Sequence, residues 1–186
     1  VDQLGAYAVA RLQLTDPLQL IIGSRISNWD THGRKWNGEL YEFDHDRELT
    51  PYAGLIYDIN DQHSAYVSYS EIFNPQEYQD RNGDFLEPLE GQNYEAGVKG
   101  EYFAGRLNAS LALFRIEQDN LAQPDVGAVV PGGIAQAYYP AQGTTSDGYE
   151  IELSGALSDN WNLLFGWAQF SAKDADGEPV NTRFPR

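Results

Sequence analysis

The chain of 186 residues contains no cysteine and no methionine, and its basic residues are few. Without cysteine, disulfide-stapled folds, thiolate zinc sites and thiol catalysis are excluded. Only 12 Lys and Arg stand against 28 Asp and Glu, which gives a formal charge of −16. Because a nucleic-acid binder needs a basic surface to displace counterions, we expect no nucleic-acid partner.

Long hydrophobic runs are also missing. The longest unbroken run, Ala6 to Ala10, covers five residues, whereas a membrane-spanning helix needs roughly 18. The first residues, Val-Asp-Gln-Leu-Gly, have neither a basic region nor an apolar stretch, so no targeting signal is expected there. The length suits a single domain, and 18 Gly with 13% aromatic residues favour a β-rich chain over a helical bundle.

The strongest pattern that is present is an alternation of apolar residues with a period of two, which predicts β-strands. It recurs as four pairs of runs, each joined by a short break of turn-forming residues. The pairs are 4–14 with 18–26, 53–59 with 65–69, 94–102 with 107–113, and 149–157 with 161–167. We therefore predict about eight strands in four antiparallel hairpins.

One face of these strands is almost entirely apolar. Only Ser24, Gly100 and Gly155 on it are not hydrophobic types, and no position on it is charged. The opposite face is polar and includes Arg11, Arg25, Asp58, Glu95, Lys99, Glu101, Glu150 and Glu152. Alternation alone leaves open whether the apolar face meets a protein core or lipid.

The lengths of the connections favour lipid. Breaks within pairs are short, whereas those between pairs run roughly from Asp30 to Glu48, Asn74 to Glu90 and Asp119 to Ser146. Outer-membrane barrels have this asymmetry of short turns on one side and long loops on the other. Compact domains instead cluster around connections of four to six residues.

Aromatic residues border the apolar face at both ends, as expected at the two interfaces of a membrane. Tyr57, Tyr102 and Trp161 lie beside the short turns, and Tyr69, Tyr94, Tyr149 and Trp167 lie toward the long connections. Tyr94 and Tyr102 are about 27 Å apart along a strand. At a tilt of about 40° this spans roughly 21 Å, close to the ~25 Å apolar band of such barrels. We predict an all-β, antiparallel, up-and-down transmembrane β-barrel segment.

No internal domain boundary is apparent, so residues 1–186 are expected to form one part of a barrel domain. The chain enters a strand abruptly at Val1-Asp2, and Asn181 to Arg186 read as a loop that approaches a further strand. We expect four hairpins from a larger barrel. A complete eight-stranded outer-membrane barrel with a structural or adhesin role is the alternative, and a soluble lipocalin-like binder or β-hydrolase is a third option.

Several stretches carry a more specific similarity. They are LTPYAGLIYDI at 49–59, SAYVSYSEIFNPQ at 64–76, LEGQNYEAGVKG at 89–100, GRLNASLALFRI at 105–116 with QDN at 118–120, and GYEIELSG at 148–155. Together these stretches resemble the barrel of TonB-dependent ferric-siderophore receptors. The resemblance implies a 22-stranded barrel closed by an N-terminal plug that follows a TonB-binding box, and both lie outside this chain. It also implies TonB-dependent uptake of a ferric siderophore through the outer membrane of a Gram-negative bacterium.

A ferric siderophore carries iron that is already fully coordinated, so its receptor needs an aromatic and polar pocket at the outer mouth. We expect no metal ligands and no cofactor. The candidates at strand tops and in long loops are Trp29, Trp36, Tyr41, Phe73, Gln76, Tyr78, Tyr138 and Tyr139. Tyr138 and Tyr139 are favoured because they follow the Gly- and Ala-rich stretch 132–137, a flexible segment able to fold over a chelate. Packing within the loops is the alternative role for each residue.

Enzyme chemistry is not expected. Glu150 and Glu152 project the same way, as an acid and base pair would, but a polar lumen wall explains them more simply. We assign Arg11, Arg25, Glu95, Lys99, Glu101, Glu150 and Glu152 to that wall. The stretch Asp44-His45-Asp46 with His32 offers ligands for a divalent ion, although an acidic solvated loop is the favoured interpretation. No nucleophile has both a base and an orienting partner.

Overall fold

The computed structural model describes residues 2–34, 38 and 40–180, and these form ten strands. The strands are β1 (Asp2–Thr15), β2 (Leu18–Arg34), β3 (Leu40–Asn60), β4 (His63–Asn74), β5 (Leu89–Tyr102), β6 (Leu107–Asp119), β7 (Leu121–Val129), β8 (Gln136–Ala141), β9 (Thr144–Ser158) and β10 (Trp161–Lys173). None of these residues belongs to a helix that is long and apolar enough to span a membrane.

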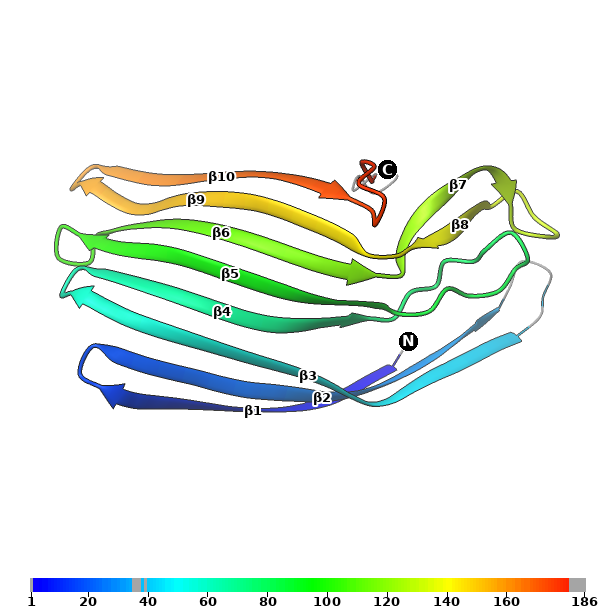
Figure 1. Cartoon of the computed structure of the whole chain (residues 1–186), viewed down its shortest axis with the longest axis horizontal. Helices are drawn as coiled ribbons and strands as arrows, with labels where there is room; N and C mark the ends of the chain where they lie inside the picture. The colour runs from blue at the N-terminus through cyan, green and yellow to red at the C-terminus, as the bar shows by residue number, and fades with distance from the viewer. Residues whose placement is uncertain (1, 35–37, 39, 181–186) are drawn as a thin grey trace.

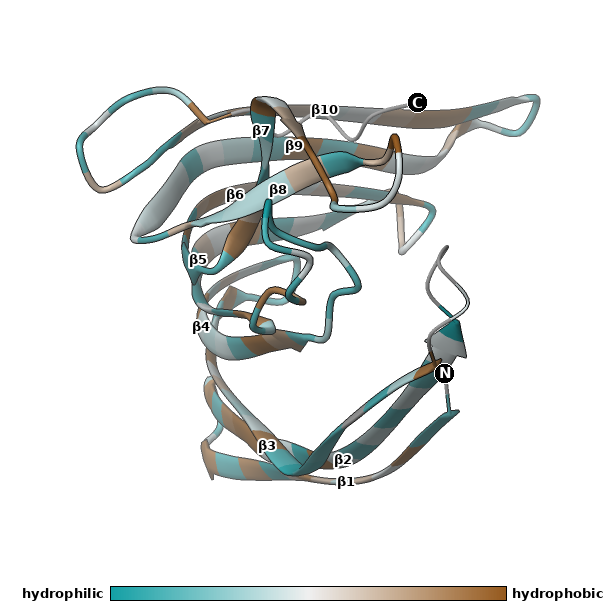
Figure 2. Ribbon diagram, turned by 90° about the vertical axis from the view of Figure 1, so that its right-hand side faces the viewer, coloured by the Kyte–Doolittle hydropathy of each residue, from teal (hydrophilic) through white to brown (hydrophobic). Residues whose placement is uncertain are grey.

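Eight strands form one antiparallel sheet in the order β1-β2-β3-β4-β5-β6-β9-β10, while β7 and β8 form a separate two-stranded sheet. Figure 1 shows the eight strands side by side, with β7 and β8 extending from one end of the sheet. In Figure 2, which looks along the strands from that end, the sheet curves into an arc that is open on one side. Within the described residues the sheet does not close, and β1 and β10 each keep one unpaired edge.

The four predicted hairpins are confirmed as β1–β2, β3–β4, β5–β6 and β9–β10. Their turns lie where the apolar alternation breaks, for example at Asp16 and Pro17, between Thr15 and Leu18. The turn after β5 uses a left-handed backbone at Gly105, with φ of 84°, a conformation that glycine adopts without a steric penalty.

Two of the connections that were predicted as long loops contain strands, so the prediction of loops is wrong there. β2 and β3 continue as a paired ladder from Asp30 with Asp44 to Arg34 with Leu40, so most of the 30–48 connection is strand. The 119–146 connection contains the β7–β8 hairpin. The β2–β3 ladder extends the existing sheet, whereas β7 and β8 pair only with each other. In both segments cross-strand pairing outweighs weak local strand signals, because strand preference depends on neighbours more than on the residue itself.

A β-bulge interrupts the β2–β3 ladder between Ser27 and Trp29. Arg47 has φ of 57° and its backbone N–H donates a hydrogen bond of 2.9 Å to Oδ1 of Asn28. Ser27 pairs with Glu48 below the bulge, and Trp29 pairs with His45 above it. A bulge adds a residue to one strand and reverses its alternation beyond that point. Odd-numbered residues of β3 therefore share the face of Trp29 above the bulge.

The apolar face is the convex one. Leu111 and Leu113 on that face are 43% and 60% exposed, whereas Ala112 between them is 8% exposed. A curved sheet crowds side chains on its concave side and spreads them on its convex side. The apolar residues Leu55 and Phe165 are likewise exposed, at 37% and 44%, and Leu20 is only half-buried. These leucines and Phe165 are therefore not buried together in a protein core. This confirms the prediction that the apolar face lies on the outside of the sheet and the polar face on the inside.

Two tyrosines, Tyr69 and Tyr94, mark the boundary of the convex apolar face at the end of the sheet nearer to β7 and β8. We call them the tyrosine row, and we call this end the upper end. Tyr69 and Tyr94 face each other across β4 and β5 with ring centroids 5.4 Å apart. Their hydroxyls donate to the next polar row, Tyr69 to Glu71 at 2.8 Å and Tyr94 to Gln92 at 2.7 Å. Each ring thus has its apolar body on the apolar side and its hydroxyl on the polar side, the arrangement expected at a membrane interface.

At the opposite boundary, Tyr102 lies beside His63, with 3.1 Å between the phenol oxygen and the Nε2 atom. The level of Tyr69 and Tyr94 and the level of Tyr102 therefore lie on either side of the apolar band predicted from the sequence.

Candidate functional site

Three elements extend beyond the upper tyrosine row, and we call them together the mouth. They are the tip of the β2–β3 hairpin, the segment 75–88 between β4 and β5, and the β7–β8 hairpin. Figure 2 shows the 75–88 segment and β8 lying across the concave side of the arc. Seven of the eight predicted candidate residues lie in these elements or at the strand tops that lead into them, and the eighth, Trp36, lies outside the described residues.

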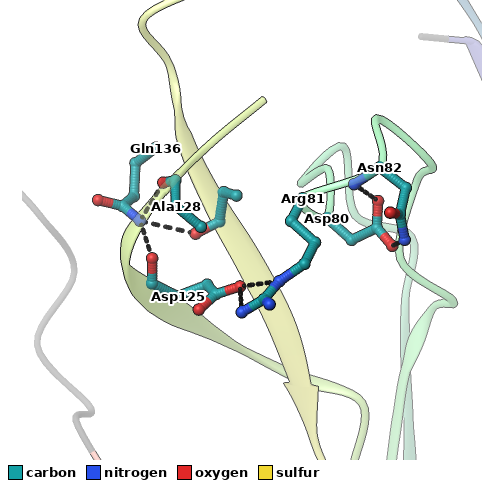
Figure 3. A network of polar contacts seen from close by, with 7 residues as sticks. Asp80, Arg81, Asn82, Asp125, Ala128 and Gln136 are labelled. Carbon is teal, nitrogen blue, oxygen red and sulfur yellow. Dashed lines mark hydrogen bonds and ion pairs between the residues drawn. The ribbon is translucent and has the colours of Figure 1, made fainter. Parts of the chain in front are cut away.

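The 75–88 segment and the β7–β8 hairpin are joined by a polar contact and a ring contact. Arg81 bonds the Asp125 carboxylate through Nε at 2.8 Å and Nη2 at 2.6 Å (Figure 3). The rings of Tyr78 and Tyr138 lie 4.4 Å apart between centroids, and the Tyr138 N–H donates to the Gln79 carbonyl at 2.9 Å. The predicted candidates Tyr78 and Tyr138 are therefore direct neighbours, although 60 positions separate them in the numbering.

Gln136 holds the irregular part of the β7–β8 hairpin. The β7–β8 register breaks between Pro124 and Val129, because proline offers no N–H to the ladder. The Gln136 side-chain amide donates to the carbonyls of Asp125 at 2.8 Å and Ala128 at 3.1 Å (Figure 3). A side chain thus supplies donors where the backbone ladder is interrupted.

Asp80 organises the tip of the 75–88 segment. Its carboxylate accepts a backbone N–H bond at 2.8 Å and a side-chain bond at 3.0 Å from Asn82 (Figure 3). It also accepts a backbone N–H bond from Asp84 at 2.9 Å. Burial acts to raise the pKa of Asp80, but these hydrogen bonds to the charged form outweigh it, so the pKa lies below its ordinary value. Gly83 completes the turn with φ of 90°.

Tyr41 links the β2–β3 tip to the 75–88 segment. Its ring lies 4.6 Å from the Phe85 ring between centroids, and its hydroxyl donates to the Glu77 carboxylate at 3.1 Å. Burial and the bond to Glu77 raise the pKa of Tyr41 above its ordinary value. Tyr41 is therefore a neutral hydrogen-bond donor at neutral pH.

The remaining candidates have different surroundings. Phe73 packs edge-on against His45 with centroids 5.5 Å apart, and Trp29 pairs with His45 across the ladder with its indole Nε1 buried and without a hydrogen-bond partner. Gln76 is buried, and its side-chain amide donates to the carbonyls of Glu87 and Asn120. Tyr139 is half exposed. Trp36 lies outside the described residues.

Contacts that sequence reasoning missed connect the mouth. No sequence motif singles out Phe85, Glu77, Arg81 or Asp125. Only the fold brings each of them to a predicted candidate or to a neighbouring loop. The sequence signals the Arg81–Asp125 pair only by placing opposite charges in two long connections. Such a signal cannot show that two residues 44 positions apart are partners.

A depression of about 510 Å³ lies below the mouth, near the tyrosine row. Its lining includes five carboxylates, those of Glu48, Glu71, Glu90, Glu117 and Asp119, together with Phe73 and Gln92. No group of His, Cys, Asp and Glu side chains within the described residues is arranged to hold a metal ion. His45, which sequence reasoning considered as a metal ligand, packs against Phe73.

The polar wall residues form short networks across neighbouring strands on the concave face. Arg11 donates to Gln19 at 2.8 Å, and Gln19 donates to Asp58 at 3.3 Å, so β1, β2 and β3 are linked. Glu95 accepts from the Tyr66 hydroxyl, and Lys99 lies 4.9 Å from the Tyr66 ring centroid.

The other wall residues complete this face. Arg25 lies between Tyr7 and Thr50 in the register, and Glu101 lies opposite Asn108. Glu152 faces the Ser110 hydroxyl at 3.5 Å, and Glu150 lies on the same face of β9. Several of these charged residues therefore contact neutral polar or aromatic partners on neighbouring strands, on the face toward the space enclosed by the arc.

Comparison with protein families gives a match over the whole chain. Residues 1–186 match the family described as TonB dependent receptor-like, beta-barrel. Among curated relatives, the ferric-pyoverdine BN7/BN8 receptor of Pseudomonas putida is 42% identical over 193 residues, which cover 100% of this chain and 23% of that protein. The ferripyoverdine receptor of Pseudomonas aeruginosa is 40% identical, over 99% of this chain and 22% of that protein.

Solved structures agree with these matches. The alcaligin outer membrane receptor FauA from Bordetella pertussis superposes with a TM-score of 0.77 and 45% identity, over 97% of this chain and 32% of that one. The ferripyoverdine receptor of Pseudomonas aeruginosa bound to ferripyoverdine gives a TM-score of 0.78 and 39% identity, over 97% of this chain and 24% of that one. The chain thus spans about a quarter of the curated relatives that it matches.

Proposed function

Because the chain belongs to the β-barrel family of TonB-dependent receptors, we propose that it forms part of the wall and mouth of an outer-membrane receptor for a ferric siderophore. In the whole protein, uptake of the chelate is driven by TonB, which contacts parts of the receptor outside these 186 residues. The relatives that cover the chain are receptors for ferric pyoverdine, and a solved relative is a receptor for alcaligin.

One observation carries the proposal from the structure itself. The sheet has an uncharged convex face bounded by tyrosines, while the elements that join its strands at one end are long and packed together. An apolar exterior is stable only against lipid. The long end then faces the outside of the cell, and the mouth lies where an external chelate arrives.

We assign the chelate to an aromatic surface in the mouth, built around the adjoining rings of Tyr78 and Tyr138. Tyr41, Phe73, Tyr139 and Trp29 are the further described candidates, and Trp36 remains a prediction from the sequence. Adjoining rings with polar tips suit a bulky chelate that offers both apolar surface and hydrogen-bonding groups. Gln76 contributes by holding the segment in place, because its amide donors are engaged by Glu87 and Asn120.

Residues 1–186 lie wholly within the barrel domain in this proposal, and the plug belongs to another part of the protein. Outer-membrane lipid contacts the convex face. The alternative of a small eight-stranded barrel with a structural or adhesin role is not favoured, because the similar receptors are about four times as long as the matched segment. The family and these relatives are transport receptors, and we propose no catalysis for this chain.

The test uses the whole receptor gene in an iron-starved strain that lacks its own siderophore receptors. Growth is scored with a panel of ferric chelates, including pyoverdines and alcaligin, and binding to the purified receptor is followed by tryptophan fluorescence. We expect at least one chelate to restore growth only when TonB is present. Growth on no chelate, together with no binding by the purified receptor, would count against the proposal.

A further inference from the structure

Aromatic rings lie over glycines on the concave face. A Cβ atom on Gly23 would overlap the Tyr52 ring, and one on Gly97 would overlap the Tyr66 ring. Each ring lies directly across the ladder from its glycine, since Tyr52 pairs with Gly23 and Tyr66 pairs with Gly97. An aromatic ring that covers a cross-strand glycine shields the backbone there and fixes the direction of the side chain.

The two rings lean away from each other. Tyr52 on β3 covers a glycine of β2, while Tyr66 on β4 covers a glycine of β5. The seam between β3 and β4 is therefore left without a large side chain where Gly54 pairs with Ser68. The nearest atoms to a Cβ on Gly54 would be the Val67 carbonyl oxygen at 3.6 Å and the Ser68 Cβ at 3.8 Å, so space is open above Gly54.

This space is a hollow of about 380 Å³ that we call the Gly54 socket. Its lining includes Ile21, Tyr52, Ile56, Tyr66, Ser68 and Lys99. Carbon predominates in this lining, although the surrounding wall is polar and includes Glu95 beside Tyr66. Water gains little in a hollow that offers few hydrogen-bond partners.

We propose that the Gly54 socket receives an apolar side chain from a part of the receptor that lies inside the barrel and outside these 186 residues. The concave face encloses space that lipid does not reach, and about three quarters of the relatives' length lies outside the matched segment. The free energy of an apolar side chain falls when it leaves water for such a site, and Lys99 in the lining can contact a polar group beside it. This inference rests on the proposed function, because only a barrel encloses the concave face.

Photo-cross-linking in the whole receptor tests the proposal. A benzophenone amino acid replaces Ser70, which lines the hollow and pairs with Tyr52, and the receptor is irradiated in native outer membranes. Mass spectrometry of the digest is expected to join position 70 to a peptide from outside this chain, at or beside an apolar residue. Products joined only to wall residues or to lipid, or no product, would overturn the socket.

Filling the socket supplies the second measurement. Gly54→Leu places an isobutyl group in the hollow and is expected to lower the cross-link yield by about fivefold or more, the lower end expected for overpacking an occupied site. Gly166→Leu is the matched control, because Gly166 pairs with Glu152 on the same face and a Cβ there meets no atom within 4 Å. An equal yield in Gly54→Leu and the unsubstituted receptor would overturn the proposal.

Ferric-chelate binding by the unsubstituted receptor separates the two hypotheses. If the receptor binds a chelate but position 70 gives no external cross-link, the socket is wrong and the proposed function stands. If the cross-link forms but no chelate binds, the assignment of a ferric-siderophore cargo is wrong, whereas the barrel and the socket stand.

Discussion

Leu111→Arg places a charge at the centre of the surface that we assign to lipid. Leu111 lies four residues from Leu107 and four from Arg115 along β6. At ~3.4 Å per residue and a tilt of about 40°, this is about 10 Å along the barrel axis from either boundary. Leu107 pairs with Tyr102, and Arg115 pairs with Tyr94, so Leu111 is midway between the two tyrosine levels.

The expected cost follows from this depth. An arginine on the lipid face of a barrel at mid-bilayer costs about 2–4 kcal/mol, and the cost falls to about 0–1 kcal/mol near the interfaces. Since ~1.4 kcal/mol changes an equilibrium constant tenfold, the unfolding equilibrium constant of the whole receptor should rise by about 30- to 700-fold. Urea unfolding in phospholipid vesicles, followed by tryptophan fluorescence, measures this shift.

Ser110→Arg is the control on the opposite face. Ser110 is adjacent in sequence but faces Glu152 across the β6–β9 pair, so a new guanidinium there meets a carboxylate and water. We expect a change within about 1 kcal/mol, as for other exposed charge pairs. Equal destabilisation by the two substitutions would refute the assignment of the convex face to lipid.

Three further predictions concern the mouth. Arg81→Ala should remove an exposed ion pair with Asp125 worth about 0.2–1 kcal/mol, seen as faster hydrogen exchange in 75–88, and unchanged exchange would contradict the link. Because the folded-state pKa of Asp80 is lowered, its contribution is present above the unfolded pKa of about 3.9 and is lost as pH falls through the lower folded value. Asp80→Asn should flatten the pH dependence of exchange in that loop, and a persistent dependence would contradict this. Tyr138→Ala should weaken chelate binding by about 1 kcal/mol through loss of the ring beside Tyr78, and an unchanged titration would remove Tyr138 from the site.

The period-two pattern predicts much of the eight-stranded sheet because it reports a physical difference between two faces. Convex residues such as Leu111 and Leu113 contact lipid in our proposal, whereas Ser110 and Ala112, which alternate with them along β6, face the interior. Each strand must keep this alternation across the membrane, so the signal is strong over every membrane-crossing run.

Beyond the tyrosine row this constraint ends, and prediction from the sequence becomes weaker. The β7–β8 hairpin contains Pro124, Pro131 and Pro140, which obscure a strand signal, and Gln136 supplies the donors that the interrupted ladder needs. The bulge beside Asn28 reverses alternation without a distinctive sequence motif. Strand tips and loop contacts in the mouth were therefore beyond what alternation predicts.

The cross-strand pairing of Tyr66 with Gly97 explains why the shape of the concave surface could not be predicted from the sequence either. In sequence, glycines at 54 and 97 look alike, and each interrupts a row of side chains on the polar face. Register separates them: Gly97 lies under the Tyr66 ring, whereas Gly54 lies opposite Ser68 and stays open. One glycine therefore accommodates a ring of the same wall, and the other leaves space for a side chain from elsewhere. A leucine at 97 should consequently displace Tyr66 and destabilise the wall itself, while a leucine at 54 should leave the wall intact and affect only what occupies the socket.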